Sequence, residues 1–180
     1  MVDSEHVFAC GASGTIIYTK DGINCSLVNV TETTNDLCGI SMFDKNHGVA
    51  VGRSETIFYT TDRESWNPAS VDPSISGKDF YAVYVTDQNT AWLIGSGFCT
   101  LGLKSVFAKT TDGGDTWTIW ESRENVFENM YALNFTSPNQ GVAVDAKGCV
   151  FVTDGNDWTF LLVNLDMIVK LWQTSLIKLM

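Results

Sequence analysis

The chain has 180 residues, of which 44% are hydrophobic and 12% aromatic, so it can bury the core of one globular domain. Lys and Arg together number 11 and Asp and Glu number 21, which leaves a formal net charge of -10 at pH 7. Because such a chain offers no basic face to neutralise phosphates, we expect neither a nucleic-acid partner nor adsorption to an anionic membrane.

The cysteine and histidine content predicts no metal site, and we expect no cofactor. The five cysteines are widely spaced, form no C-x-x-C pair and are accompanied by only two histidines. Since an odd number cannot pair completely within one chain, either at least one thiol is free or the environment is reducing. Asn-x-Ser/Thr triplets begin at Asn24, Asn29 and Asn134 and would carry glycans only in a secretory compartment. The sequence leaves the compartment open, with an extracytoplasmic (secreted or lumenal) location preferred.

From residue 5 onward the chain repeats one pattern. A turn that contains aspartate occurs as TKDGINC, TTDRESW, TTDGGDTW and VTDGNDW. Its aspartates recur with a period of ~42 residues, apart from a longer interval before the third, and this period lies in the range of propeller blades. The aspartates are Asp21, Asp62, Asp112 and Asp154.

Two further signatures keep the same period. One is a strand-like segment that ends in glycine at Gly11, Gly52 and Gly95, with Asp145 at that place in the fourth copy. The other is an apolar run that ends in turn residues, seen as LCGISMFDKN, FYAVYVTDQN and MYALNFTSPN, and it has only three copies. Because three independent signatures agree, the repeat is a supersecondary unit and not an isolated turn.

Short runs rich in β-branched and aromatic residues, such as TIIYT and TIFYT, predict the strands of each unit. About four strands per unit predict an all-β fold, a partial β-propeller of about four blades. We expect the propeller to occupy residues 1–160, in units near 5–46, 47–89, 90–139 and 140–160. Since the first unit lacks its opening strand, the chain starts within a blade, and further blades of a larger chain are expected to complete the ring.

The third unit is longer than the others by about eight residues. The extra residues lie between Phe98 and Ser105, at the connection of two predicted strands. Insertions at strand connections project from the surface, where binding residues concentrate. This segment is the candidate loop for a protein partner, through Phe98, Leu101, Leu103 and Lys104.

The third turn carries a known motif in full. TTDGGDTW matches the Asp-box, S/T-x-D-x-G-x-T-W, and residues 5 to 160 resemble the BNR/Asp-box β-propeller superfamily. The spacing and the GVAVG-type strands most resemble its photosystem II stability/assembly factor branch. The second and fourth boxes are one residue shorter, and the first has Cys25 in place of tryptophan. The resemblance implies structural turns at the periphery, formed here by Asp21, Asp62, Trp66, Thr110, Asp112, Gly114, Thr116, Trp117, Asp154 and Trp158.

The residues of the box explain it without a substrate. An aspartate side chain accepts hydrogen bonds from the amides that follow, glycine supplies a positive φ, and the tryptophan covers the hairpin. The DGGD run offers hard oxygen ligands but lacks the spacing of a calcium loop, so a turn is favoured. His6 and His47 occupy equivalent positions of two units and are also interpreted as turn residues. We therefore assign no catalytic residue.

Two enzyme classes have to be weighed against this interpretation. Sialidases carry Asp-boxes, and the resemblance implies for them three arginines around a carboxylate and an R-I-P motif. This chain has three arginines in all and no R-I-P, so that site is not expected. A glycosidase needs only two carboxylates across a cleft. The candidate acids and sugar-stacking aromatic residues are Asp79, Asp87, Glu121, Glu124, Glu128, Tyr81, Tyr84, Trp92, Trp120 and Tyr131.

The preferred function is a non-enzymatic propeller scaffold that presents loops to a protein partner, as the resemblance to assembly and stability factors implies. The alternative is a carbohydrate-active module, either a glycoside hydrolase or a sugar-binding propeller of the sialidase-like superfamily. The two differ in structure, because an enzyme brings paired carboxylates and aromatic residues into one cleft.

Residues 161–180 differ from the repeats. Leu161, Leu165, Ile168 and Trp172 follow helical spacing, which predicts an amphipathic helix. Charged residues interrupt the segment too often for a membrane span, so direct membrane insertion is not expected. Its role is open between a helix that caps an exposed edge, a strand that closes the ring and sequence foreign to the repeat. We favour the last, at the end of a fragment, and expect the tail to cover apolar surface.

Overall fold

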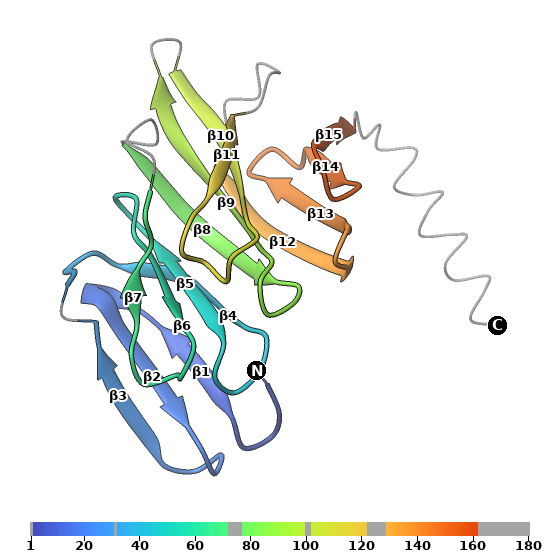
Figure 1. The fold of residues 1–180 in the computed structure, drawn as a ribbon. Coiled ribbons are helices and arrows are strands. Elements are labelled where there is room, and N and C mark those ends of the chain that lie inside the picture. Colours follow the sequence, from blue (N-terminus) through green and yellow to red (C-terminus); the bar gives the residue numbers. More distant parts are fainter. Residues whose placement is uncertain (1, 31, 72–76, 100–101, 122–128, 162–180) are drawn as a thin grey trace.

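The computed structural model describes residues 2–30, 32–71, 77–99, 102–121 and 129–161. In this part of the chain four antiparallel sheets follow one another along the sequence, and no strand crosses from one sheet into another (Figure 1). The described helical structure is one 3-10 turn, η1. The predicted all-β class is confirmed.

Each sheet is a meander in which consecutive strands pair in antiparallel fashion. The first sheet has three strands and the other three have four strands each. The elements are, sheet by sheet, β1 (Val7–Cys10), η1 (Ala12–Gly14), β2 (Thr15–Thr19) and β3 (Cys25–Asn29); β4 (Leu37–Met42), β5 (Gly48–Gly52), β6 (Ile57–Thr60) and β7 (Asn67–Pro68); β8 (Lys78–Val85), β9 (Ala91–Cys99), β10 (Gly102–Thr110) and β11 (Thr118–Glu121); β12 (Met130–Ser137), β13 (Gln140–Asp145), β14 (Val150–Thr153) and β15 (Trp158–Leu161).

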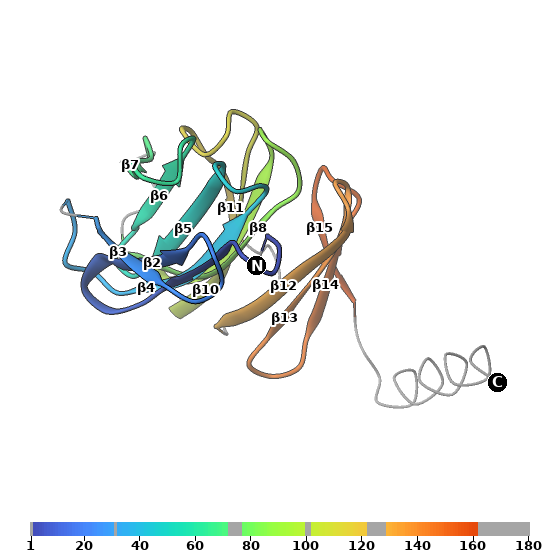
Figure 2. The same ribbon diagram turned by 90° about the horizontal axis from the view of Figure 1, so that it is seen from below.

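The first strands of neighbouring sheets pack against each other. β8 contacts both β4 and β12, so these strands form the inner side of the assembly, and each meander runs outward from it. The first and fourth sheets lie at opposite ends of the stack (Figures 1 and 2). Radial repetition of four-stranded sheets is the architecture of a β-propeller, and here the described part is a partial propeller of about four blades, as predicted.

The hydrophobic core lies in three clusters, one between each pair of consecutive sheets. Each cluster takes residues from the forward face of one sheet and the rear face of the next. Fully burying one such side chain stabilises the fold by about 1.5–3 kcal/mol. In chain order the clusters contain Ile16, Val30, Leu37, Ala50, Phe58 and Trp66; then Val49, Val51, Ile57, Phe80, Val83, Ala91, Leu93, Val106, Ala108 and Trp117; then Ile94, Phe107, Met130, Ala143 and Phe151.

Successive residues of a strand face opposite sides of its sheet, and this alternation places each strand between two clusters. In β6, Ile57 packs forward against the third sheet while Phe58 packs backward against the first. Both neighbours exist for the second and third sheets, so their strands are apolar on both faces. This explains why β5 is buried along its whole length.

The sheets and the units predicted from the sequence have different boundaries. The unit 47–89, for example, contains β5, β6 and β7 of the second sheet together with β8 of the third. The predicted amphipathic tail lies outside the described residues from 162 onward. Within the described residues, no helix has the length and apolar character needed to cross a bilayer.

Candidate functional site

The second Asp-box forms the turn between β6 and β7. Asp62 Oδ1 accepts the backbone N–H groups of Glu64 at 2.9 Å and Ser65 at 2.7 Å, and Thr60 Oγ1 accepts the N–H of Arg63 at 2.8 Å. The hydrogen bond from Ser65 is the main reason that the pKa of Asp62 lies below its usual value. The ionised carboxylate of Asp62 therefore makes its hydrogen bonds within the turn itself.

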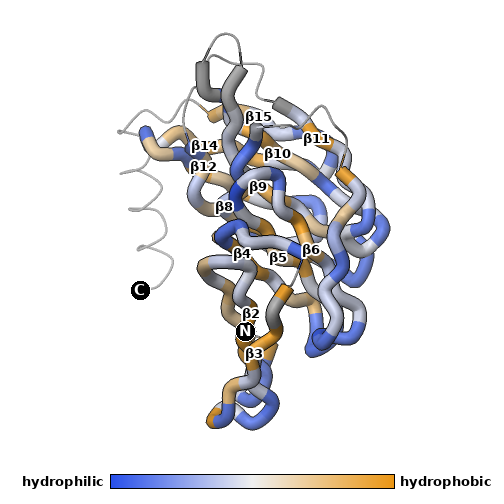
Figure 3. The backbone as a smooth tube through the Cα atoms, turned by 90° about the vertical axis from the view of Figure 1, so that its left-hand side faces the viewer, coloured by the Kyte–Doolittle hydropathy of each residue, from blue (hydrophilic) through white to orange (hydrophobic). Residues whose placement is uncertain are grey.

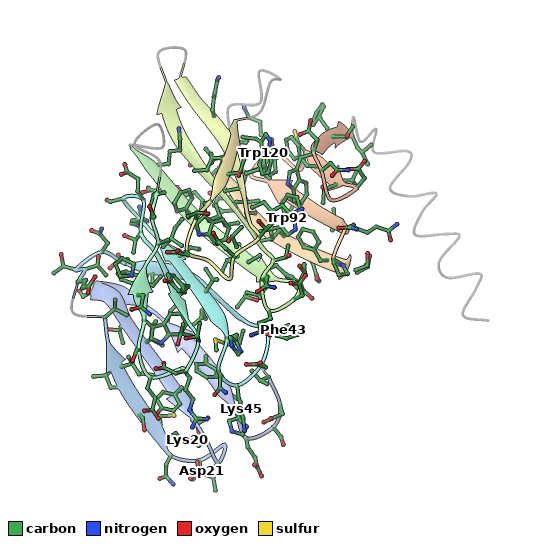
Figure 4. All side chains as sticks on the ribbon, viewed as in Figure 1. Lys20, Asp21, Phe43, Lys45, Trp92 and Trp120 are labelled. Atoms are coloured by element: carbon green, nitrogen blue, oxygen red, sulfur yellow. The ribbon has the colours of Figure 1, made fainter. Side chains whose placement is uncertain are left out.

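The first and fourth boxes use their aspartates in the same way. Asp21 Oδ1 accepts N–H groups from Ile23 at 2.9 Å and Asn24 at 2.7 Å, and Asp154 Oδ1 accepts the N–H of Asn156 at 3.0 Å. Hydrogen bonds from Asn24 and Asn156 lower the pKa values of Asp21 and Asp154 respectively. Asp21 lies at the exposed tip of the β2–β3 hairpin (Figure 4).

The third box has the most extensive network. Asp112 accepts the backbone N–H of Thr116 at 3.0 Å as well as its hydroxyl, and the hydroxyl of Thr110 donates to Asp112 at 2.7 Å. Burial raises the pKa of Asp112, but the hydrogen bonds from Thr116 outweigh it and the net shift is downward. Trp117 Nε1 donates to the carbonyl of Gly114 at 2.9 Å. The complete motif thus supplies hydrogen-bond partners to polar groups at both the start and the end of the turn.

The tryptophans of the boxes pack toward the preceding sheet. Trp66 and Trp117 are members of the clusters with the first and second sheets, and Trp158 packs against the cluster with the third. The first box has Cys25 at the tryptophan position, and this residue is exposed. No described sheet precedes the first one, so this position has no cluster to fill.

A second series of aspartate turns joins β4 to β5 and β8 to β9. Asp44 Oδ1 accepts the N–H groups of Asn46 and His47 at 2.7 and 2.8 Å, and Asp87 accepts the equivalent pair from Asn89 and Thr90. Sequence reasoning missed this series. The signal was present, because Asp stands three residues before His6 and before His47.

Both histidines are held by these turns. His6 Nδ1 lies 3.0 Å from the carboxylate of Asp3, and His47 Nδ1 lies 2.9 Å from that of Asp44. The far nitrogen of His47, Nε2, lies 3.2 Å from the side chain of Gln88. An imidazole fixed at both nitrogens by local partners is a turn residue in this geometry.

The candidate acids for glycoside hydrolysis do not converge on one cleft in the described part of the chain. Asp79 pairs with Arg53 at 3.6 Å and accepts the N–H of Ser54, while Asp87 closes its own turn. The side chain of Glu121 and the whole of Glu124 and Glu128 lie outside the described part.

The candidate aromatic residues mostly pack against one another. Tyr81 and Tyr131 form an edge contact with ring centroids 6.1 Å apart, and Tyr84 contacts Phe135 at 5.5 Å. Trp92 is fully buried between the third and fourth sheets and stacks on Trp120 at 6.1 Å (Figure 4). These ring contacts stabilise the sheets. Of the five candidate aromatic residues, Tyr131 is the one whose side chain is exposed, at 57%.

A polar groove of about 260 Å³ lies beside the third box, next to the fourth. Lys109 reaches across it, because its Nζ lies 4.7 Å from the Trp92 ring centre and donates to the carbonyl of Gly155 at 2.8 Å. The groove offers hydroxyl, amide and indole groups but no carboxylate. Its lining residues are Lys109, Thr111, Thr116, Thr118, Trp120 and Asn156.

The segment predicted as a partner loop is the end of a long hairpin. β9 and β10 remain paired as far as Cys99 and Gly102, and Leu103 pairs with Phe98. The hairpin projects beyond the neighbouring strands of its sheet (Figure 1). Lys104 is half-buried, the side chains of Phe98 and Leu103 are not described, and Leu101 lies outside the described residues. The extra residues of the third unit therefore lengthen two strands.

The terminal sheets each expose one apolar face. Ile17 and Leu27 on the first sheet are 38% and 58% exposed, and Val142 and Leu161 on the fourth are 39% and 37% exposed. Phe58 occupies the place of Ile17 in the second sheet and is buried. Figure 3 shows the hydrophobic stretches on β2 and β3 of the first sheet. The same pattern of residues is thus covered in the middle of the stack and uncovered at its ends.

Comparison with solved structures identifies β-propellers with this fold. A YCF48 protein bound to a D1 peptide superposes with a TM-score of 0.52 and 18% identity, over 88% of this chain and 64% of the other. YCF48 from Cyanidioschyzon merolae gives 0.53 and 25% identity over 71% and 37%. The endosialidase of phage phi92 gives 0.57 and 8% identity over 91% and 38%.

These comparisons concern the fold. The chain spans less than two thirds of the length of each of these three proteins. No protein-family model matches the sequence, and no curated protein matches it significantly. The neighbours confirm the predicted β-propeller architecture, which the chain shares with the two YCF48 structures and with the phage endosialidase.

Proposed function

We propose that this chain is a non-enzymatic propeller scaffold, similar in kind to an assembly or stability factor, that binds a protein partner through the β9–β10 hairpin. The observation that carries the proposal is the length of this hairpin. β9 and β10 have nine residues each, whereas β5 and β6 of the second sheet have five and four. Paired strands that extend past their neighbours present a fixed surface at small entropic cost, as a binding element should.

The use of the chemically reactive side chains supports a binding role. The box aspartates are bonded to turn amides, the described histidines are bonded to turn carboxylates, and Asp79 pairs with Arg53. A hydrolase needs two free carboxylates across one cleft. The likeness to YCF48, which binds a D1 peptide in one of the similar structures, adds a precedent for peptide binding on this fold.

Shortening the hairpin tests this proposal. Lys104 pairs with Gly97, so residues 98–103 can be replaced by Asn-Gly, a sequence that closes a two-residue hairpin. The probe is the D1 peptide, measured by fluorescence anisotropy. We expect the unmodified chain to bind it and the shortened variant to lose at least tenfold in affinity. Equal binding by both proteins would contradict the role of the hairpin, and no binding by the unmodified chain would contradict the assembly-factor analogy.

The control for the hairpin variant is its folding. The removed residues lie beyond Val106 and Ile94, the members of the hydrophobic clusters nearest this end of the pair, so the core clusters stay complete. We expect the melting temperature to change by less than about 2 °C. A larger decrease in the melting temperature would show that the variant loses affinity because it loses structure.

The groove beside Trp120 favours sugar binding as a second candidate function. Its hydroxyl and amide groups and its indole surface are typical of carbohydrate sites, and the endosialidase shares the fold. Isothermal titration with sialic acid and its oligomers would test it. A measurable heat that disappears in Trp120→Ala, with the fold intact, would favour this second function over the first.

A further inference from the structure

The junction between the third and fourth sheets differs from the two junctions before it. Tyr18, Tyr59 and Lys109 hold equivalent places, because each immediately precedes the buried threonine that ends its strand, β2, β6 or β10. In the junction of the second and third sheets the box turn packs directly on Tyr59, whose Cβ would lie 2.7 Å from a Cβ added at Gly114. In the next junction a lysine takes the place of the tyrosine, so a cation stands where the others have a phenol ring.

The turn that faces Lys109 is also shorter than the turn that faces Tyr59. From its buried threonine to its tryptophan the third box turn spans residues 110–117, whereas the fourth spans residues 153–158 and is two residues shorter. The longer turn brings Asp115 to the second sheet, where Asp115 Oδ1 lies 3.4 Å from the Tyr59 hydroxyl. The shorter turn leaves the corresponding corner of the third sheet less filled, and the polar groove of about 260 Å³ lies there.

Lys109 holds its charge in a defined position in this groove. Its Nζ lies 4.7 Å from the Trp92 ring centre and donates one hydrogen bond to the carbonyl of Gly155 at 2.8 Å. An ammonium group has three N–H donors, so it has the capacity for two more hydrogen bonds. Because these two contacts already restrict the side chain, a ligand that binds to Lys109 causes little further loss of conformational entropy.

The positive charge of Lys109 is not neutralised by an ion pair. Within the described residues no ion pair involves Lys109, whereas Lys20 and Arg53 lie 3.5 Å and 3.6 Å from the carboxylates of Glu64 and Asp79. An ammonium group in a partly buried groove without a protein carboxylate is complementary to a carboxylate on a ligand. The groove therefore favours an anionic group at this end.

The other groups of the groove suit a hydroxylated ring. Thr111, Thr118 and Asn156 are exposed and offer hydroxyl and amide groups, while the half-buried Trp120 offers part of its indole surface. Hydroxyl and amide groups hydrogen-bond to sugar hydroxyls, and an indole packs against the C–H groups of a sugar ring. Together with Lys109, these groups match a sugar that carries a carboxylate.

We propose that the groove between the third and fourth sheets selects acidic sugars, and that Lys109 is the residue that determines this selectivity by binding the carboxylate. The inference rests on the second candidate function, sugar binding at the same groove, and adds to it the class of sugar. A neutral sugar of the same shape forms no charge-assisted hydrogen bond with the ammonium group, so it binds more weakly.

Isothermal titration of the full chain with three related monosaccharides tests the selectivity. Glucuronic acid carries the carboxylate, its methyl ester keeps nearly the same shape without the charge, and glucose has neither the charge nor the ester. At constant ionic strength we expect glucuronic acid to bind at least tenfold more tightly than either neutral compound. Equal affinities for glucuronic acid and its methyl ester would overturn the proposal.

Three lysine substitutions show whether Lys109 is responsible. Lys109→Met keeps an apolar chain against Trp92 and should weaken the binding of glucuronic acid at least tenfold, whereas Lys109→Arg keeps the charge and should keep the affinity. Lys20→Met is the matched control, because Lys20 also lies over an aromatic ring, at 5.4 Å from that of Tyr18 in the first sheet. It should leave the affinity unchanged. Unchanged binding in Lys109→Met, or an equal loss in Lys20→Met, would contradict the role of Lys109.

The same measurements separate this inference from the function on which it rests. Circular dichroism spectra identical to that of the unmodified chain show that each variant keeps its fold. If neutral sugars bind and Trp120→Ala abolishes their binding, while Lys109→Met has no effect on any sugar, the groove binds sugars and the proposed selectivity is wrong. If neither acidic nor neutral sugars bind, the second candidate function is wrong and the inference is wrong with it. The D1 peptide and the hairpin variant report separately on the scaffold function.

Discussion

Asp112 holds Thr116 by two groups at once, since its carboxylate accepts both the backbone N–H at 3.0 Å and the side-chain hydroxyl. The same carboxylate accepts the hydroxyl of Thr110, which in turn accepts the N–H of Gly114 at 3.1 Å. The third Asp-box is therefore a closed network around one charged group, and removing that group leaves several donors without acceptors.

Replacing Asp112 by alanine should cost about 1–2 kcal/mol of unfolding free energy, because the turn amides lose their acceptor and a neighbouring hydroxyl is left unsatisfied. Chemical denaturation monitored by tryptophan fluorescence measures this loss. Asp112→Asn keeps an acceptor oxygen and should lose less. Unchanged stability in Asp112→Ala together with a lost ligand would contradict the structural role of this residue.

Acid should weaken the fold through the box aspartates. Hydrogen bonds from Asn24, Ser65 and Asn156 lower the folded-state pKa values of Asp21, Asp62 and Asp154. A carboxylate with a lowered pKa stabilises the fold at pH values above its unfolded pKa, near 3.8, and this stability is lost as the pH falls through the folded pKa. We expect the melting temperature to stay level from pH 7 to pH 5 and to fall below about pH 4.

The matched variant for the acid transition is Asp62→Asn. It removes one titrating group and keeps an oxygen that accepts from the amides of Glu64 and Ser65. Its melting temperature should be lower than that of the unmodified chain at pH 7 and should approach it at pH 2. A constant difference across this range would show that Asp62 does not contribute to the pH dependence.

Much of the fold follows from the sequence because the box and its partner strands recur at a regular spacing. The aspartates, the strand-forming runs and the tryptophans at 66, 117 and 158 predict meandering sheets without reference to long-range contacts. The strand alternation alone cannot predict which faces are covered. Ile16 and Ile17 are the same residue type in one strand, yet Ile16 is fully buried and Ile17 is 38% exposed. The difference comes from the neighbouring sheet, which covers one face.

The candidate site was harder to predict, for a related reason. The sequence shows that the third unit has extra residues between Phe98 and Ser105. An insertion of this length could form either an irregular loop or a longer hairpin. The pairing of β9 with β10 in the structure shows that it forms a longer hairpin.

Two adjacent glycines of the third box should respond differently to alanine. Gly114 has φ +110°, and a Cβ there would lie 2.7 Å from the Cβ of Tyr59 in the preceding sheet, so both strain and overpacking oppose the change. Gly113 has φ +80°, and its added Cβ would approach the Gln88 carbonyl at an ordinary 3.5 Å. We expect Gly114→Ala to lose about 2–4 kcal/mol and Gly113→Ala about 1 kcal/mol. Equal losses in urea titration would mean that the contact with Tyr59 is unimportant.

The reactivity of cysteines should differ between the two faces of the first sheet. Cys10 faces the second sheet, and burial, with the nearby Cys38 adding to it, raises the pKa of the Cys10 thiol from 9.0 to about 11. Its thiolate fraction at pH 8 is then about 100-fold lower than that of an ordinary thiol. Cys25 on β3 is exposed, at the place where the other boxes have tryptophan. With iodoacetamide at pH 8 and peptide mass spectrometry, Cys25 should be modified rapidly and Cys10 about 100-fold more slowly. In denaturant the two rates should become equal, and rapid modification of Cys10 in the folded chain would mean that the packing of the first sheet on the second is wrong.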